Sequence, residues 1–179
     1  ALLKSRGIRF RCQIVGDGPE LSALQEKRVM LGIEREVSFA GALVVDQVRQ
    51  LMQSATVFCL PCKVTENNDA DALPTVLLEA LACGLPSIST SISGVPEIID
   101  SGRDGILVSS ENPGELAEQV ERLLGSSGLR RTFSAAGRKK AEEKFDIHRN
   151  VGTLIRAFTE DSARMATGKS EETCSRAQA

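Results

Sequence analysis

Short apolar segments alternate with helical segments along most of this 179-residue chain, and this alternation constrains its fold most strongly. Five segments are typical of β-strands, because they are rich in β-branched and apolar residues and end at glycine, proline or polar turns. They span residues 8–16, 36–41, 56–61, 86–90 and 105–109. Helices are predicted at 18–32, 44–55, 74–84, 112–124, 128–144 and 147–165, with a turn and short helix at 93–102.

This order of elements predicts an α/β fold built on a doubly wound, Rossmann-like parallel sheet with additional C-terminal helices. We expect residues 1–166 to form one domain, truncated at its N-terminus, and residues 167–179 to be a disordered tail. In such sheets, ligands bind outside the carboxyl ends of the strands. The segments that follow strands here, 16–19, 61–75, 90–97 and 109–112, should therefore gather on one rim.

Composition narrows the class of protein. The formal net charge is −2, so a nucleic-acid partner is not expected. No apolar run approaches the ~20 residues of a membrane span, and no signal peptide is visible. The five cysteines are scattered, and the pair Cys59 and Cys62 lacks the further ligands of a zinc site. A structural role for the cysteines and a cytoplasmic location are expected.

The stretch "DALPTVLLEALACGLP", residues 71–86, places Glu79 in an otherwise apolar run. A buried, unpaired charge there would be costly, which suggests that Glu79 has a ligand. Asp71 precedes the helix that Pro74 opens, and the free N–H groups at that helix start suit a phosphate. Two carboxylates around a diphosphate would fit a nucleotide sugar. From spacing alone, the alternative is that Asp71 caps the helix and Glu79 faces solvent.

The same residues resemble the C-terminal, donor-binding domain of retaining GT-B glycosyltransferases of group 1, also called family GT4. The matching parts occur in order: an acid and a Glu separated by seven residues, a Gly-x-Pro, a Gly-x-Pro-Glu and a glycine-led strand. In this chain they are Asp71 to Glu79, Gly84 to Pro86, Gly94 to Glu97 and Gly105 to Val108. Together with "IVGDGPEL", "VSFAG" and "TVFCLP", the resemblance covers roughly residues 8–160.

The resemblance implies a role for each matching residue. Asp71 would contact the donor sugar near its reacting carbon, and Glu79 would bind the ribose hydroxyls, so these two are the candidate catalytic residues. The donor-binding set adds backbone groups at the helix start and residues at two strand ends. Its members are Gly16, Gly18, Gly41, Ala42, Ala72, Leu73, Pro74, Thr75, Val76 and Glu79. Ala72 and Asp71 stand where the family often has Gly and Glu.

The resemblance also implies a sugar transfer from a nucleoside diphosphate sugar, with no cofactor and no metal. An N-terminal domain that binds the acceptor and a loop with an Arg and a Lys would precede residue 1, since residues 1–7 resemble the end of the helix after that loop. The chain alone would then be inactive, and the full-length enzyme could associate peripherally with a membrane. Two alternatives are a non-catalytic nucleotide-binding module and a GT-B nucleotide-sugar epimerase-like protein.

Four further features favour structural interpretations. Glu97 begins a short helix, where a carboxylate is stabilised by the helix dipole. The acidic run 66–69 is typical of a solvated loop, and Lys63 beside it is a weak candidate for the donor phosphates. The single histidine, His148, is expected on the surface of a C-terminal helix, far from the rim.

Overall fold

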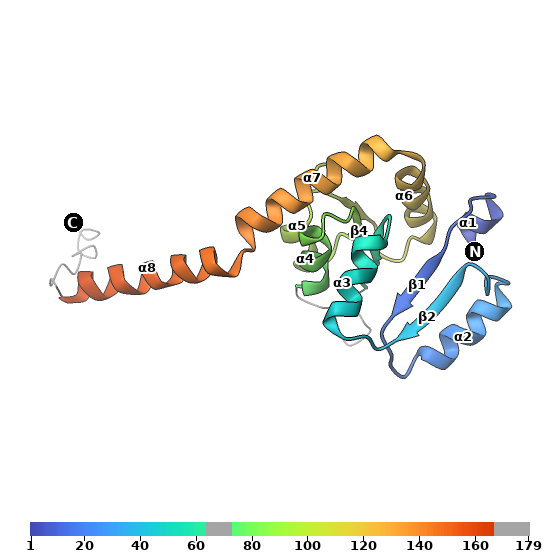
Figure 1. The fold of residues 1–179 in the computed structure, drawn as a ribbon, viewed down its shortest axis with the longest axis horizontal. Helices are drawn as coiled ribbons and strands as arrows, with labels where there is room; N and C mark the ends of the chain where they lie inside the picture. The colour runs from blue at the N-terminus through green and yellow to red at the C-terminus, as the bar shows by residue number, and fades with distance from the viewer. Residues whose placement is uncertain (64–72, 167–179) are drawn as a thin grey trace, which may run out of the picture. The chain divides into compact units, whose positions relative to one another are not determined.

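The alternating pattern of strands and helices is present in the computed structural model, which describes residues 1–63 and 73–166 (Figure 1). The strands are β1 (Cys12–Val15), β2 (Val37–Gly41), β3 (Phe58–Leu60), β4 (Ser87–Thr90) and β5 (Ile106–Val108). The helices are α1 (Leu2–Ser5), α2 (Leu21–Met30), α3 (Val45–Ser54), α4 (Thr75–Ala82), α5 (Val95–Ile98), α6 (Pro113–Gly125), α7 (Ser127–Lys144) and α8 (Ile147–Ala166). The chain divides into two units, residues 1–141 and 142–179, and each is described by itself. The predicted tail, 167–179, lies outside the described residues.

The predicted α/β fold class is confirmed. Residues that are typical of helix ends explain where several helices begin or end. Gly84 ends α4: its N–H donates to the Leu81 carbonyl at 2.8 Å, and the Leu85 N–H donates to the Ala80 carbonyl at 2.9 Å. This pair of bonds satisfies carbonyls that the end of a helix leaves free. At the start of α6, the Asn112 side chain accepts a hydrogen bond from the Glu115 N–H at 3.1 Å, as an N-cap does.

The strands form two sheets, which differs from the single five-stranded sheet that the alternation predicts. β1 pairs with β2 in one sheet, and β3, β4 and β5 pair in that order in the other. Every pair is parallel, as predicted. The sequence pattern identifies strands but not their neighbours, because apolar periodicity carries no information about which edge a strand joins.

Both faces of the three-stranded sheet are covered by helices. On one face, Ile88, Ile106 and Val108 pack with Leu123 of α6 and Phe133 of α7. On the other, Leu77 and Leu81 of α4 form a cluster with the short helix α5, against Phe58, Leu60 and Leu107 of the sheet. Helix α3 joins this second face, because Met52 packs against Ala80 and Leu85. This arrangement anchors α4, the helix that carries Glu79, in the best-packed part of the chain.

The two-stranded sheet has almost no core of its own. Residues 1–51, all of which the structure describes, contain a single buried residue, Ile33. All four residues of β1 are exposed, and no residue of α2 is buried. Large apolar side chains in this part of the chain consequently face solvent: Leu2, Ile14, Val15, Leu24, Val29, Met30, Leu31, Val44 and Val45.

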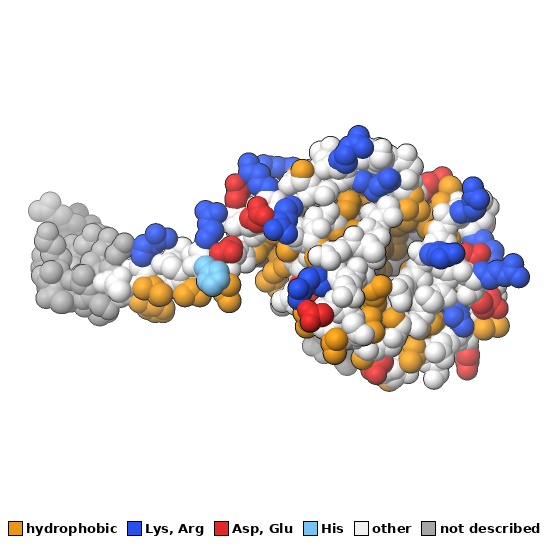
Figure 2. Space-filling model, viewed as in Figure 1, with side chains coloured by type: hydrophobic (Ala, Val, Ile, Leu, Met, Phe, Trp, Pro, Cys, Tyr) orange, Lys and Arg blue, Asp and Glu red, His pale blue; other side chains and the backbone are white. Residues whose placement is uncertain are grey.

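Helix α8 of the second unit carries an exposed apolar stripe. Its members follow helical spacing and include Ile147 and Phe158, which are 68% and 70% exposed, with Val151, Leu154 and Ile155 between them. Figure 2 shows hydrophobic side chains along one side of this helix, next to the histidine. None of the helices within residues 1–63 and 73–166 combines the length and apolar character that crossing a bilayer requires.

One buried ion-pair network fixes α7 to the turn before β5. Lys140 is 7% exposed, and its Nζ lies 3.2 Å from Oδ2 of Asp104 and 3.3 Å from Oδ2 of Asp100. The other oxygen of Asp104 accepts a hydrogen bond from the Asp100 N–H at 2.8 Å. Nζ lies at ion-pair distance from both carboxylates without a hydrogen bond of good geometry, so charge attraction rather than directional bonding holds it.

We predict that Lys140→Met destabilises the chain by about 3 to 5 kcal/mol, because it leaves the buried Asp104 carboxylate without its cation. The measurement is the free energy of unfolding from urea denaturation. Lys139→Met on the exposed side of the same helix is the matched control and should change that free energy by less than about 1 kcal/mol. Equal losses for the two variants would contradict a specific role for Lys140.

Candidate functional site

The first turn of α4 is the best-defined part of the candidate site. Helix α4 begins at Thr75, one residue later than predicted, and Pro74 is its N-cap with φ −68° and ψ 100°. Pro74 is buried, whereas Leu73 and Thr75 on either side of it are exposed. The N-cap residue itself, Pro74, makes no side-chain capping hydrogen bond. The helix start therefore combines a buried N-cap with the backbone donors of a first helical turn, which are groups that can bind an anion.

Glu79 is exposed on α4, while its neighbours Leu77, Ala80 and Leu81 are buried. Helical periodicity thus explains how one acid occurs in an apolar run: position 79 falls on the solvent-facing stripe of the helix. The Glu79 carboxylate is therefore not a buried, unpaired charge. Thr75 lies one turn earlier on the same stripe and is also exposed. The two side chains form a polar line that runs from the helix start along α4.

The structure brings two of the predicted strand-end residues, Gly16 and Gly41, together. The Gly16 N–H donates to the Gly41 carbonyl at 2.8 Å, so the ends of β1 and β2 meet. Gly16 has φ +122° and Gly41 has φ +69°, values that side chains with a Cβ rarely adopt. No atom lies within 4 Å of the Cβ position at either residue. Conformation rather than crowding therefore requires glycine at these two positions. Ala42 follows directly and is exposed, as is Gly18.

Two buried hydroxyls, which the sequence interpretation missed, hold the segment that follows β3. Ser89 Oγ donates to the Leu60 carbonyl, and Thr90 Oγ1 donates to the Cys62 carbonyl, each at 2.6 Å. Both side chains are at most 2% exposed. They fix the direction in which the chain leaves the sheet toward the start of α4. The signal in the sequence is the run "PSIST", in which hydroxyl residues occur inside a strand that is otherwise typical of a buried one.

The remaining predicted residues are only partly placed. Asp71 and Ala72 lie outside the described residues, as does the acidic run 66–69. Val76 is half-buried and packs toward the cluster around Met52. Lys63, Glu97 and His148 are exposed, which agrees with a surface position for His148. Among residues 1–63 and 73–166, no group of three or more His, Cys, Asp or Glu side chains could hold a metal ion.

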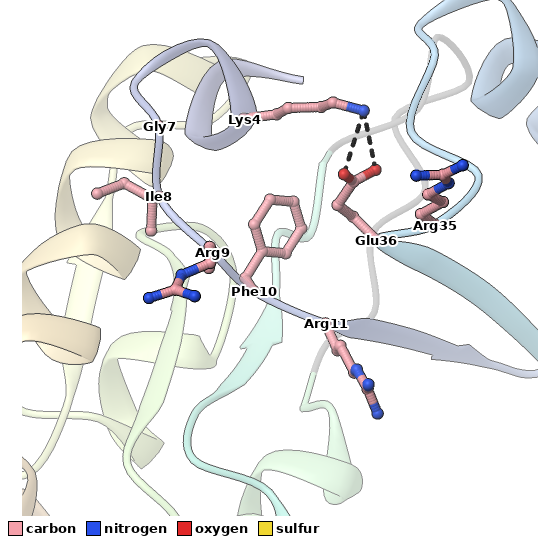
Figure 3. A pocket seen from close by; sticks show the side chains of 8 residues that line it. All are labelled: Lys4, Gly7, Ile8, Arg9, Phe10, Arg11, Arg35 and Glu36. Atoms are coloured by element: carbon pink, nitrogen blue, oxygen red, sulfur yellow. Dashed lines mark hydrogen bonds and ion pairs between the residues drawn. The ribbon is translucent and has the colours of Figure 1, made fainter.

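One hollow of the described residues lies elsewhere, at the amino ends of β1 and β2. It measures about 600 Å³ and is lined by the segment from Lys4 to Arg11 together with Arg35 and Glu36 (Figure 3). Lys4 Nζ reaches across it to both carboxylate oxygens of Glu36, at 3.1 and 3.2 Å. Ligands of doubly wound sheets bind at the carboxyl ends of strands. This hollow is therefore on the wrong edge for the predicted donor site.

The fold defines an α/β domain with parallel sheets covered by helices, and comparisons with known proteins identify the family. The chain belongs to the family Glycosyl transferases group 1, whose pattern matches residues 1–126. It is 32% identical over 163 residues to WcaL of Escherichia coli (strain K12), which is named as a colanic acid biosynthesis glycosyltransferase. That match covers 87% of this chain and 39% of WcaL. The chain thus spans well under half the length of this relative.

Solved structures confirm the fold. The crystal structure of Anabaena HepE in complex with UDP and glucose superposes with a TM-score of 0.72 at 20% identity, covering 84% of this chain and 40% of HepE. The crystal structure of the C-terminal domain of LpcC, a glycosyl transferase group 1 family protein from Francisella tularensis, gives a TM-score of 0.65 at 21% identity. That match covers 81% of this chain and 74% of the LpcC domain.

We predict that Thr90→Val destabilises the chain by about 1 to 3 kcal/mol, because the substitution removes the buried hydroxyl that donates to the Cys62 carbonyl. The free energy of unfolding from urea denaturation measures this loss. Ser91→Val, at the exposed neighbouring position, is the control and should have little effect. A Thr90→Ser variant keeps the donor and should retain most of the stability. If Thr90→Ser were as unstable as Thr90→Val, the methyl group rather than the hydrogen bond would be responsible.

Proposed function

We propose that this chain is the donor-binding, C-terminal half of a retaining glycosyltransferase that takes its sugar from a nucleoside diphosphate sugar. The observation that carries the proposal is the start of α4, where the N-cap Pro74 is buried and Thr75 and Glu79 are exposed on one face of the helix. Family membership supports the reaction class. The match to 74% of a C-terminal domain supports the placement, and the UDP in the HepE structure supports the kind of donor.

The proposed diphosphate position is the N-terminus of α4. The backbone N–H groups of Thr75 and Val76 belong to the first turn, where a helix leaves its donors free. The helix dipole adds a partial positive charge at the same end. As the bond to the sugar breaks, negative charge grows on the departing diphosphate. A donor group at this end would therefore be bound more tightly in the transition state than in the ground state, which is what accelerates a reaction.

Glu79 is proposed to accept hydrogen bonds from the ribose hydroxyls. Its exposed position leaves the carboxylate free for a ligand, one turn along the helix from the proposed diphosphate position. Hydrogen bonds to an ionised acceptor are among the stronger ones in proteins. Asp71, by resemblance, would contact the hydroxyls of the transferred sugar. The two acids would then lie on either side of the diphosphate, one for each end of the donor.

The nucleoside is proposed to rest at the ends of β1 and β2. Gly16 and Gly41 lie together there, and Gly18 and Ala42 are exposed beside them. A strand end without side chains permits the closest approach of a flat base or a ribose to the backbone. We propose that this chemistry needs no metal or other cofactor. The acceptor would bind to a part of the protein outside residues 1–179, so the chain alone would not transfer sugar.

The proposal is tested with the full-length gene product that contains this chain, incubated with UDP-, GDP- and ADP-sugars and a panel of acceptors. Transfer with the same anomeric configuration in product and donor, read by NMR, is the expected result. Inversion at the anomeric carbon would overturn the retaining mechanism. Tight nucleotide binding without turnover would indicate a binding module, and conversion of one free nucleotide sugar into another would indicate an epimerase.

We predict that Glu79→Gln in that full-length protein weakens binding of the nucleoside diphosphate by about 10- to 100-fold, the effect of losing charge-assisted hydrogen bonds. Isothermal titration calorimetry measures the affinity. Glu97→Gln, an exposed acid on α5, is the matched control and should bind as the wild type does.

A second comparison isolates the ribose contact. The 2′-deoxy nucleotide should bind the wild type more weakly than the ribonucleotide does, whereas Glu79→Gln should distinguish the two nucleotides much less. Such non-additivity is the sign of a direct interaction. If the penalties of the protein variant and the deoxy nucleotide simply add, Glu79 does not contact the ribose.

A further inference from the structure

The hollow at the amino ends of β1 and β2 concentrates positive charge. It lies between α1, the segment 7–11 that leads into β1 and the turn before β2 (Figure 3). One carboxylate lines it, that of Glu36, together with four cationic side chains. The cations are Lys4, Arg9, Arg11 and Arg35. The whole chain has a formal net charge of −2, so this excess of cations is a local feature and does not reflect the overall composition.

The carboxylate of the hollow is already paired. Lys4 Nζ lies 3.1 Å from one carboxylate oxygen of Glu36 and 3.2 Å from the other, and it also donates to the Gly32 carbonyl. Lys4 and Glu36 therefore neutralise each other and tie α1 to the turn between α2 and β2. Arg6, which follows α1, is also paired, with Glu121 of α6 at 3.0 Å. These pairs leave the three arginines of the hollow as its uncompensated charge.

Fold stability does not explain where these three arginines lie. Arg9, Arg11 and Arg35 are all exposed, and none forms an ion pair or a hydrogen bond with the part of the chain that the structure describes. Arginines that stabilise this fold make such bonds: Arg130 donates to two carbonyls at the end of α6, at 2.6 and 2.8 Å. Like charges around one hollow repel one another, so without a ligand their grouping has only a cost.

Arg9 and Arg11 project on the same side of the chain. In Figure 3, the ring of Phe10 between them points toward the Lys4–Glu36 pair, whereas both arginines point away from that pair. This alternation is that of an extended segment, in which residues two apart lie about 6 to 7 Å from each other. Long side chains at that distance can contact one ligand together. The two guanidinium groups therefore form a pair of adjacent donors in the lining of the hollow.

The chemistry of these donors favours a phosphate group. A guanidinium offers N–H groups in a planar fork that matches two oxygens of a phosphate, and such charge-assisted pairs are among the stronger hydrogen bonds in proteins. A carboxylate carries a single negative charge and would leave most of the charge of three arginines uncompensated. A phosphate monoester carries about 1.5 to 2 negative charges at pH 7, and a diphosphate carries more. Either group therefore balances the hollow better than a carboxylate does.

We propose that Arg9 and Arg11, supported by the charge of Arg35, bind a phosphate-bearing ligand at the amino ends of β1 and β2. Lys4 and Glu36 hold the shape of this site, because their pair joins α1 to the turn before β2. A soluble phosphorylated molecule and the headgroup of a membrane lipid present the same chemistry to the arginines. Binding experiments distinguish these two sources of the phosphate.

This arginine site is separate from the proposed donor site. The donor is proposed to lie at the carboxyl ends of the strands, near Gly16. Arg11 lies five residues before Gly16 in a segment that contains β1, which corresponds to about 16 Å of extended chain. A nucleotide in the donor site therefore leaves the arginines free, and substitutions at the arginines leave the donor site intact.

Calorimetric titration of the full-length gene product with inorganic pyrophosphate tests a soluble source. UDP is present in excess in every titration, so that pyrophosphate does not compete for the proposed donor site. Arg9→Gln combined with Arg11→Gln should weaken pyrophosphate binding by about 10- to 100-fold, the effect of losing charge-assisted hydrogen bonds. Arg122→Gln combined with Arg131→Gln is the matched control. It removes the same charge from exposed positions on α6 and α7 and should bind pyrophosphate as the wild type does.

Sedimentation with lipid vesicles tests a membrane source. The vesicles consist of phosphatidylcholine with or without phosphatidic acid, whose headgroup is a phosphate monoester. Binding that requires phosphatidic acid, that is lost in the Arg9 and Arg11 double variant and that persists in the control variant would identify a lipid headgroup. Pyrophosphate binding with the same dependence on Arg9 and Arg11, without vesicle binding, would identify a soluble ligand.

Two results would overturn the proposal. One is that neither pyrophosphate nor phosphatidic acid binding changes when Arg9 and Arg11 are replaced by glutamine. The other is an equal loss of binding in the control variant, since net charge alone would then account for the effect. Both double variants should keep the urea midpoint of the wild type, because exposed side chains without partners contribute little to stability.

A conservative variant and the nucleotide affinity complete the test. Arg9→Lys combined with Arg11→Lys keeps the charge but not the planar fork, so its affinity should lie between those of the wild type and the glutamine variant. Affinity equal to that of the wild type would overturn the paired guanidinium contact. UDP affinity should be unchanged in all of these variants. Failure of UDP to bind the wild type would contradict the proposed donor site and leave the arginine site standing.

Discussion

An inner strand of a parallel sheet is stable when neighbouring strands bond to both of its edges and helices cover both of its faces. The difference between the two sheets of this chain follows from where this requirement is met. It is met at β4, whose four residues are all buried between β3 and β5. Helices α4 and α5 cover one face of this sheet, and α6 and α7 cover the other. At β1 it is not met, because every residue of that strand is exposed and one of its edges pairs with no strand among residues 1–63 and 73–166. The chain is thus a well-packed half joined to a half without a core.

The candidate donor site draws one part from each half. Helix α4 belongs to the packed half, so the position of its first turn is fixed by the buried Pro74 and Leu77. The glycine pair at the ends of β1 and β2 belongs to the other half. A rigid helix end is the right support for a diphosphate, because binding then costs little reorganisation. The nucleoside end of the site depends on how firmly the two sheets are joined.

Much of this architecture is predictable from local signals in the sequence. Gly84, Asn112 and the apolar strands identify helix ends and strand positions because each acts on groups within a few residues of it in the sequence. The exposure of Glu79 is harder to predict from the sequence. A single acid in an apolar run suggests burial until it is known which face of the helix the acid lies on. Ser89 and Thr90 bond to carbonyls about 28 residues away, and the break between β1 and β3 depends on strand neighbours. Such long-range pairings leave no periodic signal in the sequence.

The two sheets and the candidate site are linked by the geometry of doubly wound folds. Ligands of these folds bind at the carboxyl ends of parallel strands. The Gly16–Gly41 pair lies at the carboxyl ends of β1 and β2 in one sheet, and the segment that leaves β3 in the other sheet is held by Ser89 and Thr90. The proposed donor site therefore takes its nucleoside end from the two-stranded sheet and its diphosphate end from the helix packed on the three-stranded sheet. The distance between those two ends depends on how the two sheets are held together.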